Sequence, residues 1–531
     1  MITNKREGGV PDPLEFQRRF AEMFRTPPPP KPEADGGGVD DGQTPQEKPP
    51  TIRFDMKPEE LEAYLNQYVI KQGQAKEILA TKICTHFNRM RLEENRGGEQ
   101  DDVGNIKNNI ILIGPTGVGK TYLIKLIAGK IGVPFVKGDA TKFSETGYVG
   151  GDVEDLIRDL VRGADGDLDT AQYGIVYIDE IDKIASSGTV VGPDVSRTGV
   201  QRALLKLMEE TEVDLRVPHD LASQMEAVMQ FQRTGKLEKK KINTKHILFI
   251  VSGAFNGLED IIKRRLNKQA IGFGSEQRPR GDTTETYLKQ VKSEDLIQYG
   301  FESEFVGRVP VVAVLEELTV DDLYQILKNP NNSVIMGKKR DFEAYGIQIE
   351  FEDAALRRIA ELAAEERTGA RGLVSVCERV LLKFEKKLPS TDIRRFMVTE
   401  DIVNDPERGL TRLLTVESVR EYEEEFFRTH GIRLTFSDRA LEILGARAQA
   451  EGISAGALCR RLLEDYGYGL KLVQRDVFVV TEEVLDDPKG VVDRLIKAFY
   501  SREHEPQGAE VVEPDETHEG VRAATSDELL R

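Results

Sequence analysis

A glycine-rich loop between a short apolar run and a helix-like stretch constrains this chain more than any other feature. The loop, GPTGVGKT at residues 114–121, fits the pattern G-x-x-x-x-G-K-[ST]. The apolar run NIILI precedes it, and the helix-like run YLIKLIAGKIG follows it. Such glycines let backbone N–H groups converge on phosphates, while Lys120 reaches the β- and γ-phosphate oxygens and Thr121 holds Mg²⁺. We therefore predict a P-loop nucleotide-binding site. The predicted nucleotide-binding residues at this loop are Gly114, Pro115, Thr116, Gly117, Val118, Gly119, Lys120, Thr121 and Tyr122.

A second apolar run ends in acidic residues. The sequence GIVYIDEID places Asp179 and Glu180 after a strand-like segment, and the carboxyl ends of parallel strands gather around the ligand in doubly wound sheets. An acidic pair at a strand end is usually only solvated, but the P-loop earlier in the chain makes a catalytic role the stronger interpretation. Phosphoryl transfer depends on positioning and charge neutralisation. Asp179 therefore suits a second Mg²⁺ ligand, and Glu180 suits the base that orients the attacking water.

Periodicity and composition divide the chain into five parts. Strand-length apolar runs (NIILIG, GIVYID, HILFIVSG) alternate with long amphipathic stretches, which predicts a doubly wound α/β domain with a parallel sheet. Helix-like segments then predict an α-rich small domain. The predicted parts are an arm at 1–50, a large ATPase domain at 51–318, a small domain at 319–410, a degenerate second copy of the small domain at 411–500 and an acidic tail at 501–531.

The second copy is inferred from an internal repeat. FEAYGIQIEFEDAALRRIAELAAEE at 342–366 matches FRTHGIRLTFSDRALEILGARAQAE at 427–451, so the offset in numbering is 85. FMVTEDIVNDPERG at 396–409 matches FVVTEEVLDDPKG at 478–490, with the offset shortened to 82. No second P-loop accompanies the repeat, so we expect the copy to serve as an interaction or rigidifying module.

Composition limits the expected partners. The formal net charge of −18 would repel a phosphate backbone, so nucleic acid is not an expected partner. The three cysteines form no C-x-x-C pair, so we expect no disulfide framework and no zinc. Without a run of about 18 apolar residues or a secretory signal, the protein is expected to be soluble and cytoplasmic, with no membrane contact.

Both ends are predicted to be disordered, because they cannot bury enough apolar surface to offset chain ordering. Within the proline-rich arm, Phe16, Phe20, Met23 and Phe24 recur at helical spacing. This pattern fits a short docking helix and a frayed helix equally well.

Six motifs resemble, in order and spacing, those of the ClpX-like unfoldases of the Clp/HslU family of AAA+ ATPases. They are GPTGVGKT, GYVGGDVEDLI, GIVYIDEIDKIA, GVQRALLKLMEE, EFVGRVPVVA and TGARGL, within a resemblance that covers residues 60 to about 405. GPDVSRTGVQRALL and KHILFIVSGAF are also similar to the sibling unfoldase HslU. The resemblance implies an AAA+ large domain followed by its small domain, with ATP and Mg²⁺ bound between them in a hexameric ring.

The resemblance also implies roles that the residues alone leave open. Val69 and Ile70 would contact adenine, Arg308 would enter the neighbouring subunit's site, and Arg371 would sense the nucleotide from the small domain. Positive charge at both arginines suits a departing γ-phosphate. The implied pore residues, which grip a protein substrate through Tyr148, are Gly147, Tyr148, Val149 and Gly150, and the implied docking residues for a ClpP-type peptidase are Ile271, Gly272 and Phe273.

Departures from the family pattern concern substrate choice. No cysteine precedes Cys84, so we expect no N-terminal zinc domain of the ClpX kind. The pore-entrance sequence RKH is replaced around 213–245 by a longer segment whose basic run, KLEKKKINTK, is either a substrate contact or a solvated turn. In the repeat, Gly456 stands at the position of Arg371, so the second copy is not expected to sense nucleotide.

The sequence thus predicts an ATP-dependent protein unfoldase that acts as a ring and feeds a ClpP-type peptidase. The alternative is a free-standing remodelling chaperone without a peptidase, and a third reading is a nucleotide-dependent scaffold. The apolar loop at 271–273 favours the first, and the presence of Lys120, Glu180 and Arg308 argues against the scaffold.

Overall fold

The computed structural model describes residues 54–95, 107–144, 151–186, 195–215, 240–270, 284–331 and 333–503. All of them lie in one compact unit, Pro50–Arg531. The arm, the predicted loops at 147–150 and 271–273, and the chain beyond residue 503 lie outside the described residues.

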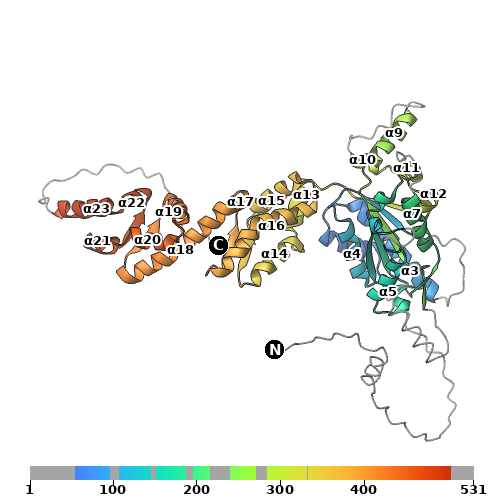
Figure 1. Ribbon diagram of the computed structural model, residues 1–531, viewed down its shortest axis with the longest axis horizontal. Helices are drawn as coiled ribbons and strands as arrows, with labels where there is room; N and C mark the ends of the chain where they lie inside the picture. The colour runs from blue at the N-terminus through green and yellow to red at the C-terminus, as the bar shows by residue number, and fades with distance from the viewer. Residues whose placement is uncertain are drawn as a thin grey trace, which may run out of the picture. The chain divides into compact units, whose positions relative to one another are not determined.

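A parallel sheet of five strands forms the centre of the first domain (Figure 1). The strand order is β2-β3-β6-β1-β7, and every neighbouring pair is parallel. The strands are β1 Ile110–Ile113, β2 Phe135–Asp139, β3 Ile175–Asp179, β6 Leu248–Gly253 and β7 Val311–Val314. β1 and β6 are buried along their whole length, as expected for inner strands of a parallel sheet that is covered on both faces.

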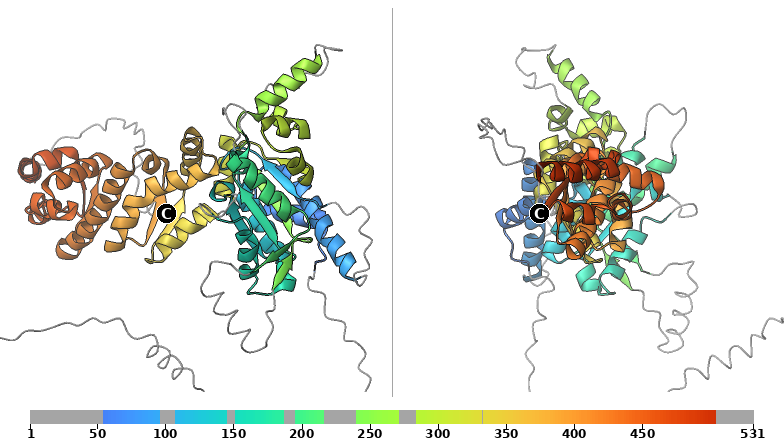
Figure 2. Two further views of the ribbon diagram at one scale, coloured as in Figure 1. Left: turned by 45° about the vertical axis from the view of Figure 1, so that its right-hand side comes forward. Right: turned by 90° about the vertical axis from the view of Figure 1, so that its left-hand side faces the viewer.

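Helices pack on both faces of this sheet, and alternate strand residues supply two separate cores (Figure 2). In β1, Ile110 and Leu112 belong to one core, while Ile111 and Ile113 belong to the other. The core that contains Ile110 and Leu112 includes residues of α2 Pro58–Tyr68, α3 Gly73–Asn95 and α4 Lys120–Ile131. The core that contains Ile111 and Ile113 includes residues of α5 Asp155–Gly163, α7 Val195–Met208, α9 Leu258–Ala270, α11 Ser293–Tyr299 and α12 Ser303–Arg308. Shorter elements are η1 Ala140–Lys142, α6 Leu168–Ala171, η2 Ile181–Ile184, α10 Thr284–Leu288 and the antiparallel pair β4 Glu212–Asp214 and β5 Lys241–Asn243. The predicted doubly wound α/β fold is confirmed.

An α-rich small domain follows, as predicted. Its elements are α13 Val320–Lys328, α14 Ser333–Glu343, β8 Gln348–Phe351, α15 Asp353–Glu365, α16 Ala370–Lys387, η3 Leu388–Ser390, β9 Arg395–Val398 and α17 Glu400–Asn404. β8 and β9 pair in parallel, and their inward residues Ile349, Phe396 and Val398 join the core formed by the helices.

The C-terminal region repeats the strand order of the small domain. Its elements are α18 Pro406–His430, β10 Arg433–Phe436, α19 Asp438–Glu451, α20 Ala455–Leu462, α21 Tyr466–Leu472, β11 Val477–Val480, α22 Glu482–Asp486 and α23 Pro488–Glu503. β10 and β8 begin at positions 433 and 348, and β11 and β9 begin at positions 477 and 395. These starts reproduce the two offsets of the sequence repeat, and both strand pairs are parallel. The architecture is therefore that of a further α/β region with the periodicity of the repeat; its interpretation as a degenerate copy stays a prediction.

Two helices cross the domain boundaries that the sequence suggests. α18 contributes Leu410 to the small-domain core and Val419 and Phe426 to the C-terminal core, so one continuous helix serves both. α23 continues through Glu503, past the predicted start of the tail at Ser501.

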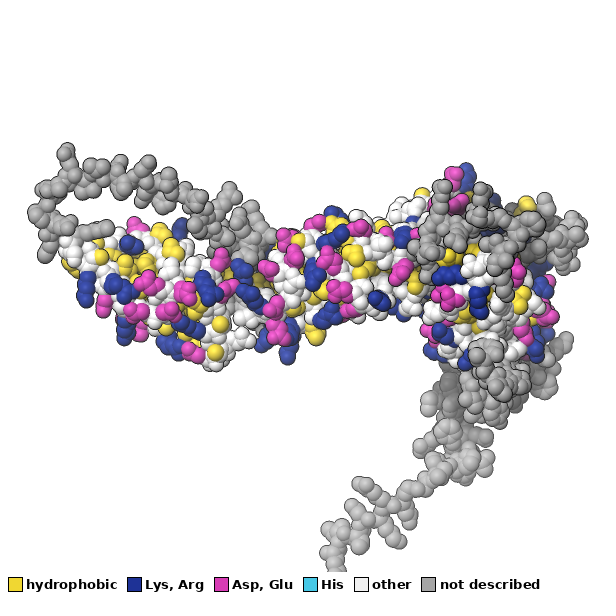
Figure 3. Space-filling model, turned by 90° about the horizontal axis from the view of Figure 1, so that it is seen from above, with side chains coloured by type: hydrophobic (Ala, Val, Ile, Leu, Met, Phe, Trp, Pro, Cys, Tyr) yellow, Lys and Arg dark blue, Asp and Glu magenta, His cyan; other side chains and the backbone are white. Residues whose placement is uncertain are grey.

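Charged side chains of both signs are interspersed over the described surface in Figure 3, and the described part of that face shows no continuous basic stripe. Among the helices that the structure describes, none combines the length and the apolar character that crossing a membrane requires.

Candidate nucleotide-binding site

A cavity of about 440 Å³ lies at the carboxyl end of the sheet, with walls from both the large and the small domain. The P-loop residues 116–122 form one wall, Asp179 and Glu180 lie at the end of β3, and α16 contributes Arg371. Tyr68, Val69 and Ile70 close the cavity beside the P-loop, and Leu318, Ile326, Leu373 and Val374 close it from the linker and the small domain. The site residues that were predicted to bind nucleotide within one subunit therefore line the same cavity, except Gly114 and Pro115.

Gly114 and Pro115 support the loop from behind instead of lining the cavity. The Gly114 N–H donates to the Gly253 carbonyl at 3.2 Å, which fastens the P-loop to the end of β6. A Cβ added at Gly114 would lie 2.7 Å from the Leu315 carbonyl oxygen, so this position has no room for a side chain.

The P-loop is shaped to present backbone N–H groups. Gly117 and Gly119 have φ values of 81° and 96°, a left-handed conformation that favours glycine. α4 begins at Lys120, directly after Gly119, so the loop lies at a helix N-terminus, where free N–H groups and the helix dipole favour anions.

Lys120 folds back onto its own loop. Its Nζ donates to the carbonyls of Gly114 and Pro115 at 2.6 and 2.8 Å. Burial lowers the pKa of its ammonium to about 8, Asp179 and Asp182 oppose this shift, and Arg371 adds to it. The two carbonyls are neutral acceptors. A phosphate would give the Lys120 ammonium a negatively charged partner instead.

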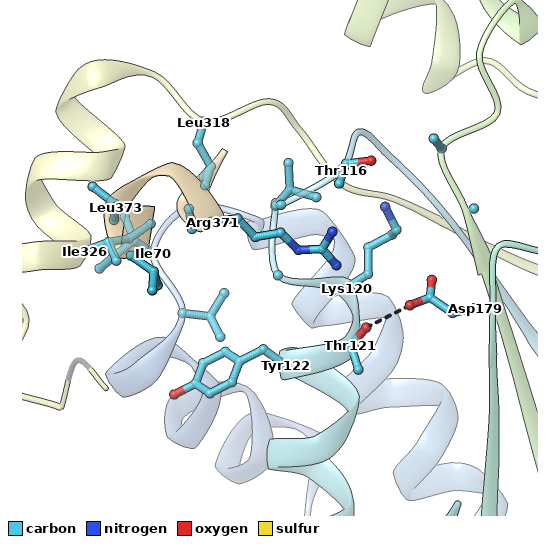
Figure 4. A pocket seen from close by; sticks show the side chains of 18 of the residues that line it. Ile70, Thr116, Lys120, Thr121, Tyr122, Asp179, Leu318, Ile326, Arg371 and Leu373 are labelled. Carbon is cyan, nitrogen blue, oxygen red and sulfur yellow. Dashed lines mark hydrogen bonds between the residues drawn. The ribbon is translucent and has the colours of Figure 1, made fainter. Parts of the chain in front are cut away.

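Thr121 and Asp179 lie together, as a shared Mg²⁺ site requires. The Thr121 hydroxyl donates to Asp179 Oδ2 at 3.2 Å (Figure 4), and Lys137 Nζ lies 2.9 Å from the same oxygen and 3.5 Å from Thr121 Oγ1. The Lys137 ammonium thus contacts both Asp179 Oδ2 and Thr121 Oγ1. A carboxylate oxygen and a hydroxyl oxygen are donors that fit Mg²⁺. Burial pushes the pKa of Asp179 upward, but hydrogen bonds from Lys137 and Ser252 outweigh it and hold the carboxylate ionised.

A buried hydrogen-bond chain holds Asp179 in place. Ser252 Oγ donates to Asp179 Oδ1 at 2.8 Å, and Tyr177 Oη lies 2.6 Å from Ser252 Oγ and 3.1 Å from Thr121 Oγ1. Burial raises the pKa of Tyr177 to about 12, so its phenol stays protonated. The sequence reasoning did not identify Lys137, Tyr177 or Ser252 as site residues, although Ser252 lies near the end of the run HILFIVSG and the strand-end rule could have found it.

Glu180 is exposed at the cavity and has a strained backbone. Its φ of 57° is in the left-handed region, which is unfavourable for a residue with a side chain. Such conformations persist where the surrounding structure enforces them, and they cluster at functional sites. Two residues further along the chain, the buried Asp182 accepts from the Ala254 N–H at 3.3 Å and ties this turn to the end of β6.

The small domain closes directly onto the P-loop. The Ala370 N–H donates to the Gly117 carbonyl at 2.9 Å, and a Cβ at Gly117 would lie 1.9 Å from the Thr368 carbonyl oxygen. The next residue, Arg371, extends its guanidinium toward Lys120 along the cavity, beyond the apolar end formed by Ile70, Ile326 and Leu373 (Figure 4). The cavity therefore has an apolar end suited to a flat base and a charged end suited to phosphates.

Arg308, which was predicted as a catalytic residue, does not line this cavity either. It ends α12, its side chain is 54% exposed, and its guanidinium pairs with Glu209 at 2.8 Å. Asn109 donates to its backbone carbonyl at 2.9 Å and fixes the end of the helix.

Comparison with protein-family models identifies two segments. Residues 105–312 match the model described as an AAA domain (Cdc48 subfamily). Residues 318–385 match the model described as the C-terminal, D2-small domain of ClpB protein. The two matches meet at the short linker between β7 and α13, next to which the cavity lies.

Proposed function

We propose that this chain, an AAA+ ATPase of the Clp/Hsp100 type, acts as a ring that unfolds and translocates proteins and supplies them to a ClpP-type peptidase. One observation carries the ATP-dependent part of the proposal. The P-loop, the acidic end of β3 and Arg371 converge on a single cavity with an apolar end and a charged end.

Each cavity residue has a chemical role in this proposal. Bound ATP supplies a γ-phosphoryl group whose transfer to water releases the free energy for unfolding. Lys120 and the P-loop N–H groups bind the phosphates, and Thr121 and Asp179 hold Mg²⁺. Glu180 orients the attacking water and accepts a proton from it. Arg371 neutralises phosphate charge from the small domain, so that bound nucleotide favours the closed arrangement of the two domains.

Arg308 would act on a neighbouring subunit. Its exposed guanidinium at the end of α12 lies outside its own cavity. An arginine supplied in trans stabilises the charge that develops during phosphoryl transfer. In the resting subunit, Glu209 would hold the guanidinium until the neighbour's phosphate competes for it.

Substrate gripping by Tyr148 and peptidase docking by the loop at 271–273 rest on the sequence resemblance. Both positions lie outside the described residues. A tyrosine side chain offers a large contact surface to a polypeptide, and an apolar tripeptide among polar residues suits a hydrophobic cleft.

The decisive test of the site is Glu180→Gln. This variant should bind ATP normally, because the phosphate and metal contacts remain, and should lose turnover, because the water loses its base. Glu77→Gln, at an exposed α3 position that does not line the cavity, is the matched control and should hydrolyse ATP at the wild-type rate. Normal hydrolysis by Glu180→Gln would remove this residue from the proposed role.

Two further variants separate the motor from its partner. Tyr148→Ala should keep ATPase activity but stop the unfolding of a folded fluorescent reporter. In a pull-down with ATP, wild type should retain a ClpP-type peptidase and Phe273→Ala should not. If wild type unfolds the reporter but retains no peptidase, the function is that of a free-standing remodelling chaperone.

A further inference from the structure

The loop between α2 and α3, residues 69–72, has an unusual backbone. Val69 and Ile70 line the apolar end of the cavity. The next two residues, Lys71 and Gln72, have φ values of 59° and 60°. Consecutive non-glycine residues in the left-handed region are unfavourable, so other contacts must hold the loop in this shape.

The Gln72 side chain supplies one such contact. It is only 2% exposed, and its amide forms two hydrogen bonds with the backbone of Glu316. Nε2 donates to the Glu316 carbonyl at 2.8 Å, and Oε1 accepts from the Glu316 N–H at 2.7 Å. Glu316 belongs to the linker, residues 315–319, which joins β7 of the large domain to α13 of the small domain.

Lys71 supplies the second contact and extends it into the small domain. Its Nζ donates to the Glu317 carbonyl at 2.6 Å and lies 3.7 Å from a carboxylate oxygen of Glu316. It also lies 3.3 Å from Asp322 Oδ2, in the first turn of α13. Its side chain is 22% exposed, so water screens these contacts only in part.

The other end of α13 is fastened to the same part of the large domain. Asn329, the C-cap of α13, donates from Nδ2 to the Gln67 carbonyl at 2.9 Å, and Asn331 donates to the same oxygen at 3.3 Å. Gln67 lies in the last turn of α2, just before the loop. The segment 67–72 is therefore attached to the start and to the end of one small-domain helix.

The linker itself reaches the cavity. Leu318 lines it, as Val69 and Ile70 do. A base bound there touches both the loop and the linker, and Lys71 and Gln72 connect the two directly. A displacement of the loop by a base would therefore reach the linker through these hydrogen bonds.

We propose that Lys71 and Gln72 are positioning residues that couple the base-binding end of the cavity to the linker between the large and small domains. This inference rests on the proposed function, because it requires a nucleotide base at Val69 and Ile70. It goes further by making the identity of the base, and not only the phosphates, a determinant of linker conformation.

The test compares Lys71→Met with Lys289→Met. Methionine keeps the aliphatic stem of Lys71 and removes its charge. Lys289 also forms an ion pair with Glu316, but it approaches from the segment after α10 and does not belong to the loop. Lys289→Met therefore removes a cation from the same linker glutamate without altering residues 69–72. Gln72→Met, which removes both hydrogen bonds to Glu316, is the second variant.

The first measurement is the ratio of kcat/KM for ATP to that for CTP. Lys71→Met should lower this ratio by about tenfold, the effect of losing a charge-assisted hydrogen bond that positions the base contacts. Lys289→Met should keep the wild-type ratio. Equal ratios in wild type, Lys71→Met and Gln72→Met would overturn the proposal, and so would an equal fall in Lys71→Met and Lys289→Met.

The second measurement is hydrogen exchange in the linker peptide, with and without ADP. In wild type and Lys289→Met, ADP should slow exchange at 315–319, whereas in Lys71→Met and Gln72→Met this nucleotide-dependent protection should be lost. Unchanged protection in both loop variants would overturn the coupling. A wild-type protein that binds neither ADP nor ATP would instead contradict the proposed function itself.

Discussion

Replacing Gly117 by alanine tests whether contact between the P-loop and the small domain is part of the nucleotide-binding arrangement. The added Cβ would lie 1.9 Å from the Thr368 carbonyl oxygen, whereas ordinary contacts begin at 3.4 Å. The segment before α16 would therefore have to move away until the distance from the added Cβ to the Thr368 carbonyl oxygen reaches about 3.4 Å. Such a displacement breaks the 2.9 Å hydrogen bond from the Ala370 N–H to the Gly117 carbonyl.

The magnitude has two separable parts. A left-handed alanine costs about 1–2 kcal/mol relative to its preferred conformation, and this part lowers the free energy of unfolding. Loss of the hydrogen bond costs about 1 kcal/mol more, and this part opposes closure onto nucleotide. Gly132→Ala is the control for the first part, because Gly132 has a φ of 79° and no atom within 4 Å of an added Cβ.

Chemical denaturation and calorimetric titration with ADP separate the two effects. Both variants should lose about 1–2 kcal/mol of stability, but only Gly117→Ala should bind ADP at least about fivefold more weakly. Ala370→Pro provides a second route, because proline removes the donor N–H and is tolerated at the first position of a helix such as α16. If Gly117→Ala and Ala370→Pro both bind ADP as tightly as wild type, the contact has no part in nucleotide binding.

Two further predictions concern charge and packing. Burial lowers the pKa of Lys120 to about 8, and phosphates favour the charged form. ADP affinity should therefore fall as pH rises above about 8, by up to about tenfold per pH unit. A flat profile in titrations at pH 7, 8 and 9 would contradict this coupling between Lys120 protonation and ADP binding. A Cβ added at Gly456 would lie 2.6 Å from the Ser418 carbonyl oxygen. Gly456→Ala should therefore destabilise the C-terminal region by about 1–3 kcal/mol in denaturant unfolding, while the ATPase rate stays at the wild-type value. A loss of ATPase activity at unchanged stability would contradict a purely packing role for Gly456.

The inner strands of the sheet could be predicted from sequence, but the edge strand β2 could not. β1, β3 and β6 lie between other strands and are covered on both faces, so they are continuous apolar runs. The edge strand β2, FVKGD, has one buried residue, Gly138, among exposed and half-buried ones. Its sequence therefore lacks the signal that burial on both faces imposes on the inner strands.

The site residues likewise fall into those that the sequence predicts and those that only strand pairing brings in. Lys120, Thr121 and Asp179 belong to local motifs whose spacing is visible in the chain. Lys137 reaches Asp179 because β2 pairs with β3 in a register that places Lys137 opposite Tyr177. Ser252 joins because the end of β6 lies beside the end of β3. Pairing between strands far apart in sequence decides both contacts. The position of Ser252 near a strand end could have pointed to the site, but no local pattern encodes the register that brings Lys137 to Asp179.

The internal repeat is informative because its two halves use the same position differently. In the small domain, Arg371 follows the segment that closes onto the P-loop. In the C-terminal region the corresponding Gly456 packs against α18, and its N–H donates to Ser418 Oγ at 3.0 Å. α18 in turn contributes Leu410 to the small-domain core and Phe426 to the C-terminal core. Because one unbroken helix belongs to both cores, a rotation of the small domain about the linker would carry the C-terminal region with it.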